Sequence, residues 1–300
     1  MITLSNGHQF EFMAASGALK FDGHGWPWEQ PFRWVGLIDP TLFTIVIKTL
    51  TRQPRKGNLR MYKPWGCVRL LPGGGAVNSV GLTNPGIDWW CRSVGPRVSA
   101  FAKASADRQG LGYSLVGSII ADSTQEWVEM AQMLNPFALK ALELNLSCPN
   151  TTDHKVLSEH SDKLAEMVRA VKAVSKFPLI AKLSVVHPYQ ELVGKLEGLV
   201  EAVSINTIPW TRIYPDKVSP IAHLGGGGVS GKLAQPMLWT MAREMALAST
   251  IPVIGSSVWE YEDVQKVFDL GCKAVSFGSV FMPYPWRPTQ FVRRWKREHA

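Results

Sequence analysis

The chain has 300 residues, of which 46% are hydrophobic, and it carries a formal net charge of +8 at pH 7. This length and apolar content exclude a disordered protein and suffice for one large core, as in α/β barrels of this size. The four cysteines lie far apart without a CxxC pair, which predicts no disulfide framework, no metal site and a cytoplasmic location. No apolar run could span a bilayer, and the N-terminal residues lack the pattern of a signal peptide.

Much of the positive charge is concentrated in the segments Thr51–Lys63 and Phe291–Ala300. We interpret both as solvated surface, and RNA binding is the alternative that a basic protein leaves open. Trp26, Trp28 and Trp34 form an aromatic cluster, for which packing within a loop and docking of a partner are both considered.

From about residue 41, short apolar runs alternate with longer helical patterns. The expected strands are Phe43–Lys48, Tyr113–Ser118, Ala141–Leu146, Leu179–Lys182, Ala202–Ile205, Pro252–Ile254 and Ala274–Phe277. The expected helices are Thr124–Leu134, Ser158–Ser175, Gln190–Leu199, Lys232–Ala248 and Glu260–Leu270. This rhythm predicts an α/β protein with a (β/α)8 TIM barrel as a single domain over residues 1–300, and a doubly wound sheet is the alternative.

Polar residues and glycines recur where the expected strands end. They are Lys48, Ser118, Asn145, Lys182, Asn206 with Thr207, Gly255 and Gly278. In a barrel these positions converge on the face that carries active sites. Two long connections, at about residues 50–77 and 208–224, leave from the same face and are expected to act as lids or binding loops.

The most informative segment is LELNLSCPN, Leu142 to Asn150. Its alternation of leucines with polar residues is typical of a strand, and Pro149 ends that strand just after Cys148. A cysteine there can carry a proton, and Asn145 and Asn150 can hydrogen-bond a planar polar ligand. The structural alternative is a small buried thiol beside a turn.

Three glycine-containing or serine-containing segments follow later strands. They are Gly225–Gly231, Ile254–Ser257 and Phe277–Ser279. Turns after the last two strands of a barrel often bind phosphate, so together the segments predict a phosphorylated cofactor. Each segment alone is more typical of a flexible turn.

Between about Phe12 and Phe281, the motifs resemble those of the dihydroorotate dehydrogenase family, in particular its soluble class 1 members. The motifs are FMAASG, IKT with RQPRKGN, NSVGLTNPG, ELNLSCPN, AKLS, SINT and GGGGVSG. The resemblance implies oxidation of dihydroorotate to orotate in pyrimidine biosynthesis, with hydride transfer to bound FMN.

By this resemblance Cys148 is the catalytic base that takes the C5 proton, and Lys48 lies between flavin and substrate. The implied substrate-binding residues are Lys48, Asn78, Gly81, Leu82, Asn145, Asn150, Asn206 and Thr207. The implied FMN-binding residues are Ala15, Ser16, Lys48, Ser118, Asn145, Lys182, Gly227, Gly228, Gly255, Ser256, Ser257, Gly278 and Ser279.

The chain departs from the family pattern at the first phosphate turn, where Ser256 and Ser257 replace a glycine pair. Serine reduces the backbone freedom that glycine supplies, which puts the details of cofactor binding in question. The RQPRKGN and GGGGVSG segments favour class 1B, whose catalytic chain passes electrons to an iron–sulfur flavoprotein subunit. Ser118 and the NSVGLTNPG segment favour class 1A, which uses fumarate.

The expected assembly is a homodimer, or a heterotetramer with the second subunit. Other functions considered are a reductase like dihydropyrimidine dehydrogenase, a tRNA dihydrouridine synthase, and a homologue without catalytic activity. Asn78, Asn150 and Asn206 fit a free carboxylated pyrimidine, and no appended basic RNA-binding domain is evident, so we expect no nucleic-acid partner.

Overall fold

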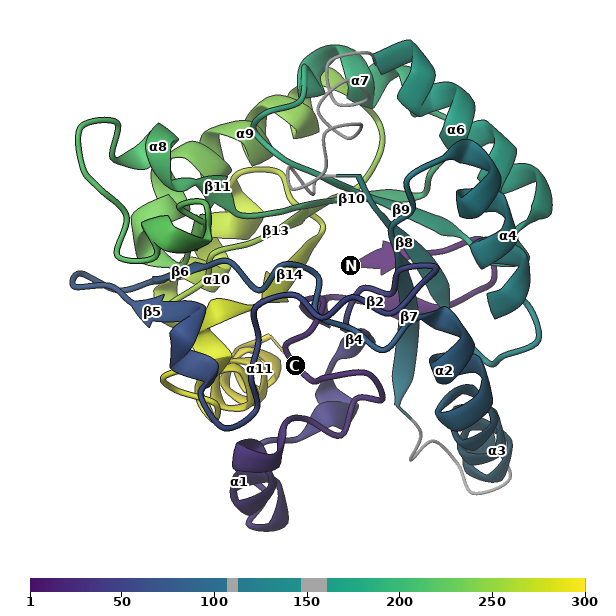
Figure 1. Cartoon of the computed structure of the whole chain (residues 1–300), viewed down its shortest axis with the longest axis horizontal. Helices are drawn as coiled ribbons and strands as arrows, with labels where there is room; N and C mark the ends of the chain where they lie inside the picture. Colours follow the sequence, from purple (N-terminus) through teal and green to yellow (C-terminus); the bar gives the residue numbers. More distant parts are fainter. Residues whose placement is uncertain (107–112, 147–160, 300) are drawn as a thin grey trace.

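The computed structural model describes residues 1–106, 113–146 and 161–299. Its centre is a closed barrel of eight parallel strands (Figure 1). In barrel order the strands are β3 (Phe12–Ala14), β4 (Thr44–Val46), β7 (Ser114–Ile119), β8 (Ala141–Asn145), β9 (Leu179–Leu183), β10 (Ala202–Ile205), β13 (Val253–Gly255) and β14 (Ala274–Phe277). Pairing of β14 with β3 closes the circle. The predicted (β/α)8 barrel is confirmed, and the doubly wound sheet is not the fold.

Helices surround the barrel. They are α2 (Ile87–Ser93), α3 (Gly95–Ala106), α4 (Thr124–Leu134), α6 (Ser161–Val174), α7 (Tyr189–Lys195), α9 (Gln235–Ala248), α10 (Glu262–Asp269) and α11 (Arg287–Glu298), with the short α1 (Gln30–Trp34) and α8 (Trp210–Ile213). Helix α4 has the predicted bounds because Ser123 caps it, its hydroxyl accepting a hydrogen bond from the Glu126 N–H. Within the described ranges, no helix combines the length and apolar character needed to cross a membrane.

Several described elements were not predicted from the sequence, among them helices α2 and α3, strand β3 and helix α11. Strand β3 has only three residues, too few for a clear period. Helix α11 lies in the basic C-terminal segment that we interpreted as solvated surface. Its arginines face outward, but Phe291, Val292 and Trp295 are buried. The helix is therefore amphipathic and part of the core.

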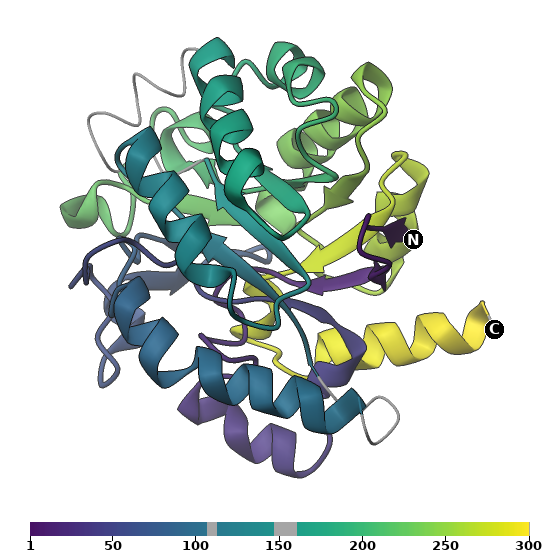
Figure 2. The ribbon, with the colours of Figure 1, turned by 90° about the vertical axis from the view of Figure 1, so that its right-hand side faces the viewer.

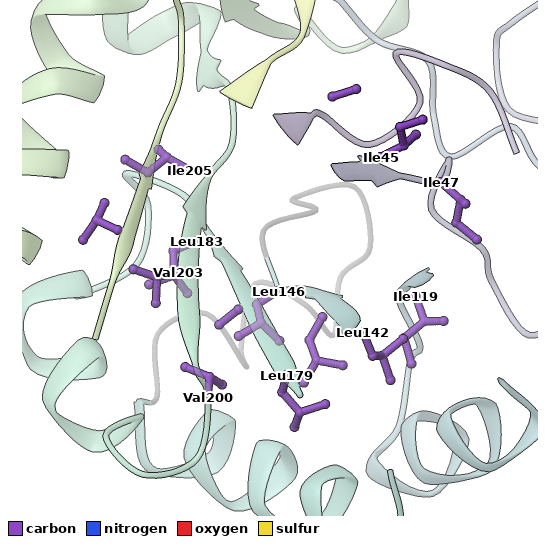
Figure 3. Packing of buried hydrophobic residues seen from close by; sticks show 14 of the residues in the cluster. Ile45, Ile47, Ile119, Leu142, Leu146, Leu179, Leu183, Val200, Val203 and Ile205 are labelled. Atoms are coloured by element: carbon purple, nitrogen blue, oxygen red, sulfur yellow. The ribbon is translucent and has the colours of Figure 1, made fainter. Parts of the chain in front are cut away.

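The barrel strands separate two apolar layers. Side chains at alternate positions, such as Leu142 and Leu144 of β8, point outward and pack with the helices; several of this outer layer are drawn in Figure 3. The intervening positions point into the barrel, where Met13, Val46 and Ile180 belong to a second cluster. Side chains of a strand alternate with period two, so the residue two places later along each strand also points inward.

The barrel has one closed end and one open end. At the closed end, the hairpin β1 (Ile2–Thr3) and β2 (Gln9–Phe10) places Ile2, Leu4 and Phe10 against the inner cluster. Figure 2 shows this N-terminal hairpin at the opposite end of the barrel from the long connections drawn in blue and green. At the open end, no such apolar plug is formed by the described residues.

The two long connections contain regular structure that was not predicted. They form an antiparallel sheet in the order β11 (Ile208–Pro209), β12 (Gly228–Ser230), β6 (Ala76–Asn78) and β5 (Val68–Leu70). The pairing of Gly228 with Asn78 joins segments 150 residues apart. The short 3-10 helices η1 (Pro27–Glu29), η2 (Pro40–Leu42), η3 (Pro64–Gly66), η4 (Ala222–Leu224), η5 (Lys232–Ala234) and η6 (Ser279–Phe281) complete the described elements.

Candidate active site

A cavity of about 1320 Å³ opens at the carboxyl ends of the barrel strands. Its wall combines strand ends with the antiparallel sheet. Most of the predicted site residues line it, namely Ala15, Ser16, Lys48, Asn78, Gly81, Leu82, Asn145, Lys182, Asn206, Thr207, Gly227, Gly228, Ser256, Ser257, Gly278 and Ser279. The structure thus brings together residues that are up to 264 positions apart in the chain.

Inside the barrel, a polar layer lies directly above the inner apolar cluster. It is formed by the next inward-facing residue of most barrel strands, two places after the apolar one. Examples are Val116 followed by Ser118, Ala141 by Glu143, Ile180 by Lys182, Ala202 by Ser204, and Ala274 by Ser276. The change from apolar to polar along one face marks the floor of the cavity.

Hydrogen bonds join this layer across neighbouring strands. The Thr49 hydroxyl lies 2.9 Å from the Ser16 hydroxyl and 2.9 Å from the Ser118 hydroxyl. Ser118 in turn donates to Oε1 of Glu143 at 3.0 Å, and the Asn145 amide donates to Thr49 at 3.1 Å. A continuous polar chain therefore runs from β3 to β8 beneath the cavity.

Ser118 belongs to this chain and does not reach the cavity wall, because it is fully buried between Thr49 and Glu143. Gly255 likewise lies behind the wall. A Cβ atom at Gly255 would lie 2.3 Å from Val267 of α10, so this glycine permits close packing of a helix on β13. Ser118 and Gly255 were both predicted to bind the cofactor. The structure instead places Ser118 beneath the cavity wall and gives Gly255 a role in packing.

The turn after β13 offers donors to an anion. The Ser256 and Ser257 carbonyls accept hydrogen bonds from Trp239 and Gln235 of α9. In a trans peptide the following N–H points the opposite way, so the Ser257 and Val258 amides are directed toward the cavity, which both residues line. The Ser256 hydroxyl is buried and has no hydrogen-bond partner in the described structure. An unsatisfied buried hydroxyl beside two such amides fits a phosphate group.

Ser257 adopts a φ of +64°, a left-handed conformation that is costly for any residue with a Cβ atom. The turn thus keeps a glycine-like backbone although glycine is absent. The serine that replaces glycine at this position therefore holds a strained backbone.

The glycine-rich segment has a steric role. Cβ atoms at Gly227 and Gly228 would lie 2.6 Å from the Asn78 carbonyl and 2.3 Å from the Thr207 hydroxyl. These glycines let β12 approach both neighbours closely, which brings Asn78 and Thr207 to the same wall. These two glycines therefore position side chains that are predicted to bind the substrate.

Residues 33–286 match the profile of the dihydroorotate dehydrogenase family. The chain belongs to the dihydroorotate dehydrogenase family. It is 32% identical over 246 residues to the "Dihydroorotate dehydrogenase B (NAD(+)), catalytic subunit" of Geobacillus kaustophilus (strain HTA426), with 79% of this chain and 73% of that protein covered.

Two further relatives carry the same description. The protein of Bacillus caldolyticus is 31% identical, with the same coverage of both chains. That of Bacillus cereus (strain B4264) is 31% identical over 244 residues, with 79% of this chain and 74% of the relative covered. The family resemblance predicted from the motifs is confirmed, and with it the assignment to the oxidoreductases that act on dihydroorotate.

Two residues that the family motif implies, Cys148 and Asn150, lie outside the described residues. The structure does describe the strand that leads to them. Strand β8 ends at Asn145, whose side chain lines the cavity. The Leu146 carbonyl is 3.2 Å from Nε2 of the buried His187, whose Nδ1 lies 2.9 Å from the Ser184 backbone nitrogen. Burial lowers the pKa of His187 below its ordinary value.

Sequence reasoning missed several cavity residues. Glu143 was seen only as part of an alternating pattern, although it points inward with Asn145. Trp26 and Trp28, considered as a packing or docking cluster, stack with their ring centroids 5.3 Å apart and line the cavity. Beside them the buried Glu29 carboxylate accepts a hydrogen bond from the Trp26 N–H at 2.7 Å, and burial raises its pKa to about 7. A signal for Glu143 existed in the period-two pattern, but its inward direction required the barrel.

Proposed function

We propose that this chain oxidises dihydroorotate to orotate with FMN bound in the cavity, and that residues 1–300 form one FMN-binding domain. The observation that carries this proposal is the convergence of Lys48, Asn145 and Lys182 with the Ser256–Ser257 turn on one cavity. The turn offers amides and a hydroxyl to a phosphate, and the strand ends offer ammonium and amide groups to planar rings. FMN, when bound, supplies a two-electron acceptor.

The proposed chemistry removes two hydrogens from adjacent carbons. Cys148, as a thiolate, would take the C5 proton of dihydroorotate, and FMN, when bound, would accept the C6 hydride, so that a C5–C6 double bond forms. Asn78, Asn145, Asn150 and Asn206 hold the pyrimidine amides, with Thr207 and the backbone of Gly81 and Leu82 completing the contacts. Lys48 provides a cation for the substrate carboxylate and favours the thiolate.

FMN contacts are assigned on the same basis. Lys182 would support the electron-rich edge of bound FMN, and the segment with Ala15 and Ser16 would contact the flavin through its backbone. Gly278 and Ser279, at the end of β14, complete the phosphate site with Ser256 and Ser257. The support for this arrangement is that all these residues line one cavity.

We further propose class 1B, in which a second subunit accepts the electrons. The relatives described above are catalytic subunits by name. The cavity rim also carries exposed apolar side chains, including Trp28, Trp65 and Met282, of which Trp65 is 56% exposed. Exposed Arg69 and Arg212 line the same cavity. An apolar rim with arginines fits an electron-transfer subunit that presents an apolar and acidic face.

The partner proposal has a direct test. Trp65→Ser is expected to weaken binding of the electron-transfer subunit, measured by titration with purified subunit. Leu247→Ser removes a similarly exposed apolar side chain that does not line the cavity, and should leave binding unchanged. Equal binding by both variants would reject the rim as a docking surface. Light scattering then separates a homodimer from a heterotetramer.

The proposal also includes a cytoplasmic location. The cysteines of the described part of the chain, Cys67, Cys91 and Cys272, are free. Free, separated cysteines fit a reducing compartment. Fractionation of cells that produce the protein, followed by immunoblotting, tests this location.

The central experiment is anaerobic. The visible spectrum of the purified protein is recorded before and after addition of dihydroorotate. A flavin spectrum that bleaches supports FMN, substrate and hydride transfer together, and Cys148→Ala should keep the flavin spectrum but lose the bleaching. A persistent flavin spectrum would reject dihydroorotate and lead to tests with uracil derivatives and tRNA. A protein that binds no FMN would reject the enzymatic proposal and favour a non-catalytic homologue.

A further inference from the structure

Glu143 is a carboxylate at the centre of the barrel that none of the roles above uses. Its side chain is nearly fully buried on strand β8. Its Oε1 accepts a hydrogen bond from Ser118 at 3.0 Å, and its Oε2 accepts one from Ser204 at 3.3 Å. Nζ of Lys182 lies 3.8 Å from Oε1. Four neighbouring strands, β7 to β10, thus meet at one carboxylate.

The strand register explains why these groups meet. Ser118 is paired with Glu143 across β7 and β8, and Ser204 is paired with Lys182 across β10 and β9. A buried carboxylate is costly unless hydrogen bonds and a cation satisfy it, and here both are present. Lys182 is itself buried to 9% exposure but lines the cavity. Glu143 therefore balances the charge of Lys182 from beneath the cavity floor, and Lys182 itself lines the cavity.

The same carboxylate orders the hydroxyl chain. Because Ser118 gives its single proton to Glu143, it can only accept at its other contact, with Thr49. Thr49 then donates to Ser118 and offers its lone pairs to the Asn145 amide. The negative charge at Glu143 thus sets the direction of the Ser118–Glu143 and Thr49–Ser118 bonds, whereas the Ser16 hydroxyl can donate either to the Ile47 carbonyl or to Thr49.

We propose that Glu143 is a positioning residue, which fixes the Lys182 ammonium at the cavity floor and orients Asn145 through Ser118 and Thr49. This inference rests on the proposed FMN site, and it adds that the flavin reduction potential depends on the buried carboxylate of Glu143, which acts through Lys182. In Glu143→Gln the buried ammonium of Lys182 loses its countercharge, so it moves away from the cavity floor. Positive charge near the ring stabilises the reduced flavin, so its loss lowers the potential.

The direction in which the flavin reduction potential changes tests the proposal. The midpoint potential of bound FMN is measured for the wild-type protein, Glu143→Gln, Lys182→Met and the double variant. We expect both single variants to lower the potential and the double variant to match Lys182→Met, because Glu143 acts through Lys182. A higher or unchanged potential in Glu143→Gln would overturn the proposal, since it would make Glu143 a simple countercharge or a structural group. Glu201→Gln removes a carboxylate that binds Ser5 and does not line the cavity, and it serves as the matched control, with no change expected.

A second readout does not need FMN. Amine-labelling of the apoprotein at pH 8, quantified at Lys182 by peptide mass spectrometry, should be several-fold faster in Glu143→Gln than in wild type. Unchanged labelling would overturn the proposal even if the wild-type protein bound no FMN, whereas absent FMN binding by itself would reject only the proposed function. If Glu143→Gln does not fold, Glu143→Asp replaces it, because the shorter side chain withdraws the charge and should give smaller changes of the same sign.

Discussion

The left-handed backbone at Ser257 predicts that glycine stabilises this protein. A residue with a Cβ atom in this region costs about 1–2 kcal/mol relative to an ordinary conformation. Glycine avoids that cost, but it loses more freedom on folding, which offsets about 0.4–1 kcal/mol. With φ at +64°, Ser257→Gly is therefore expected to raise the free energy of unfolding by about 0.5–1 kcal/mol.

The assay is urea unfolding of the apoprotein, followed by tryptophan fluorescence. Ser279→Gly is the matched control because Ser279 lines the same cavity but does not have a positive φ. It should lower stability by about 0.5–1 kcal/mol, as expected for glycine in a regular conformation. The FMN dissociation constant of Ser257→Gly should stay near the wild-type value, because glycine keeps the backbone N–H groups of the turn.

The result that would refute the reasoning is a Ser257→Gly protein no more stable than wild type, with Ser279→Gly destabilised as expected. The turn would then not be strained at Ser257, and the serine would contribute a compensating interaction. An increase of the same size in both variants would show that the measured change has nothing to do with φ.

Three further predictions concern buried polar groups. Ser256→Ala removes a buried hydroxyl that has no described partner, so the free energy of unfolding of the apoprotein should rise or stay equal, and FMN should bind more weakly. A less stable apoprotein with unchanged FMN affinity would contradict a contact between this hydroxyl and the phosphate. Because the Glu29 pKa is raised to about 7, its contribution to stability is full below pH 4.5 and is lost as the pH rises through 7. Glu29→Gln should therefore match wild type at pH 4 but be more stable by up to about 3 kcal/mol at pH 8, and an equal difference at both pH values in urea unfolding would exclude this cause. Asn84 is buried and forms hydrogen bonds with Thr51, Leu82 and Gly86. Asn84→Ala should therefore lower the free energy of unfolding by about 2–4 kcal/mol in thermal or urea unfolding, and it should weaken dihydroorotate binding through the loop that contains Leu82. A loss of stability below about 0.5 kcal/mol would mean that other groups replace these hydrogen bonds.

The sequence by itself determined the alternation of strands and helices and the positions of the strand ends. Thr124–Leu134 was predicted to its exact bounds because a capping serine and a clear apolar period coincide there. The cluster of Lys48, Asn145 and Lys182 could also be predicted, because parallel strands of a barrel bring their carboxyl ends to one face. These features depend on local chemistry and on one rule of topology.

Only the tertiary structure decided which face of each strand looks inward. The leucines of β8 could equally have filled the barrel, but they pack against helices, and Glu143 and Asn145 point inside. Closure of the barrel makes that choice, since period two defines two faces without saying which is central. The strain at Ser257 and the pairing of β6 with β12 likewise depend on contacts distant in sequence. The partnership of Glu143 with Lys182 exists for the same reason: adjacent strands set their register, and register is a property of the assembled sheet.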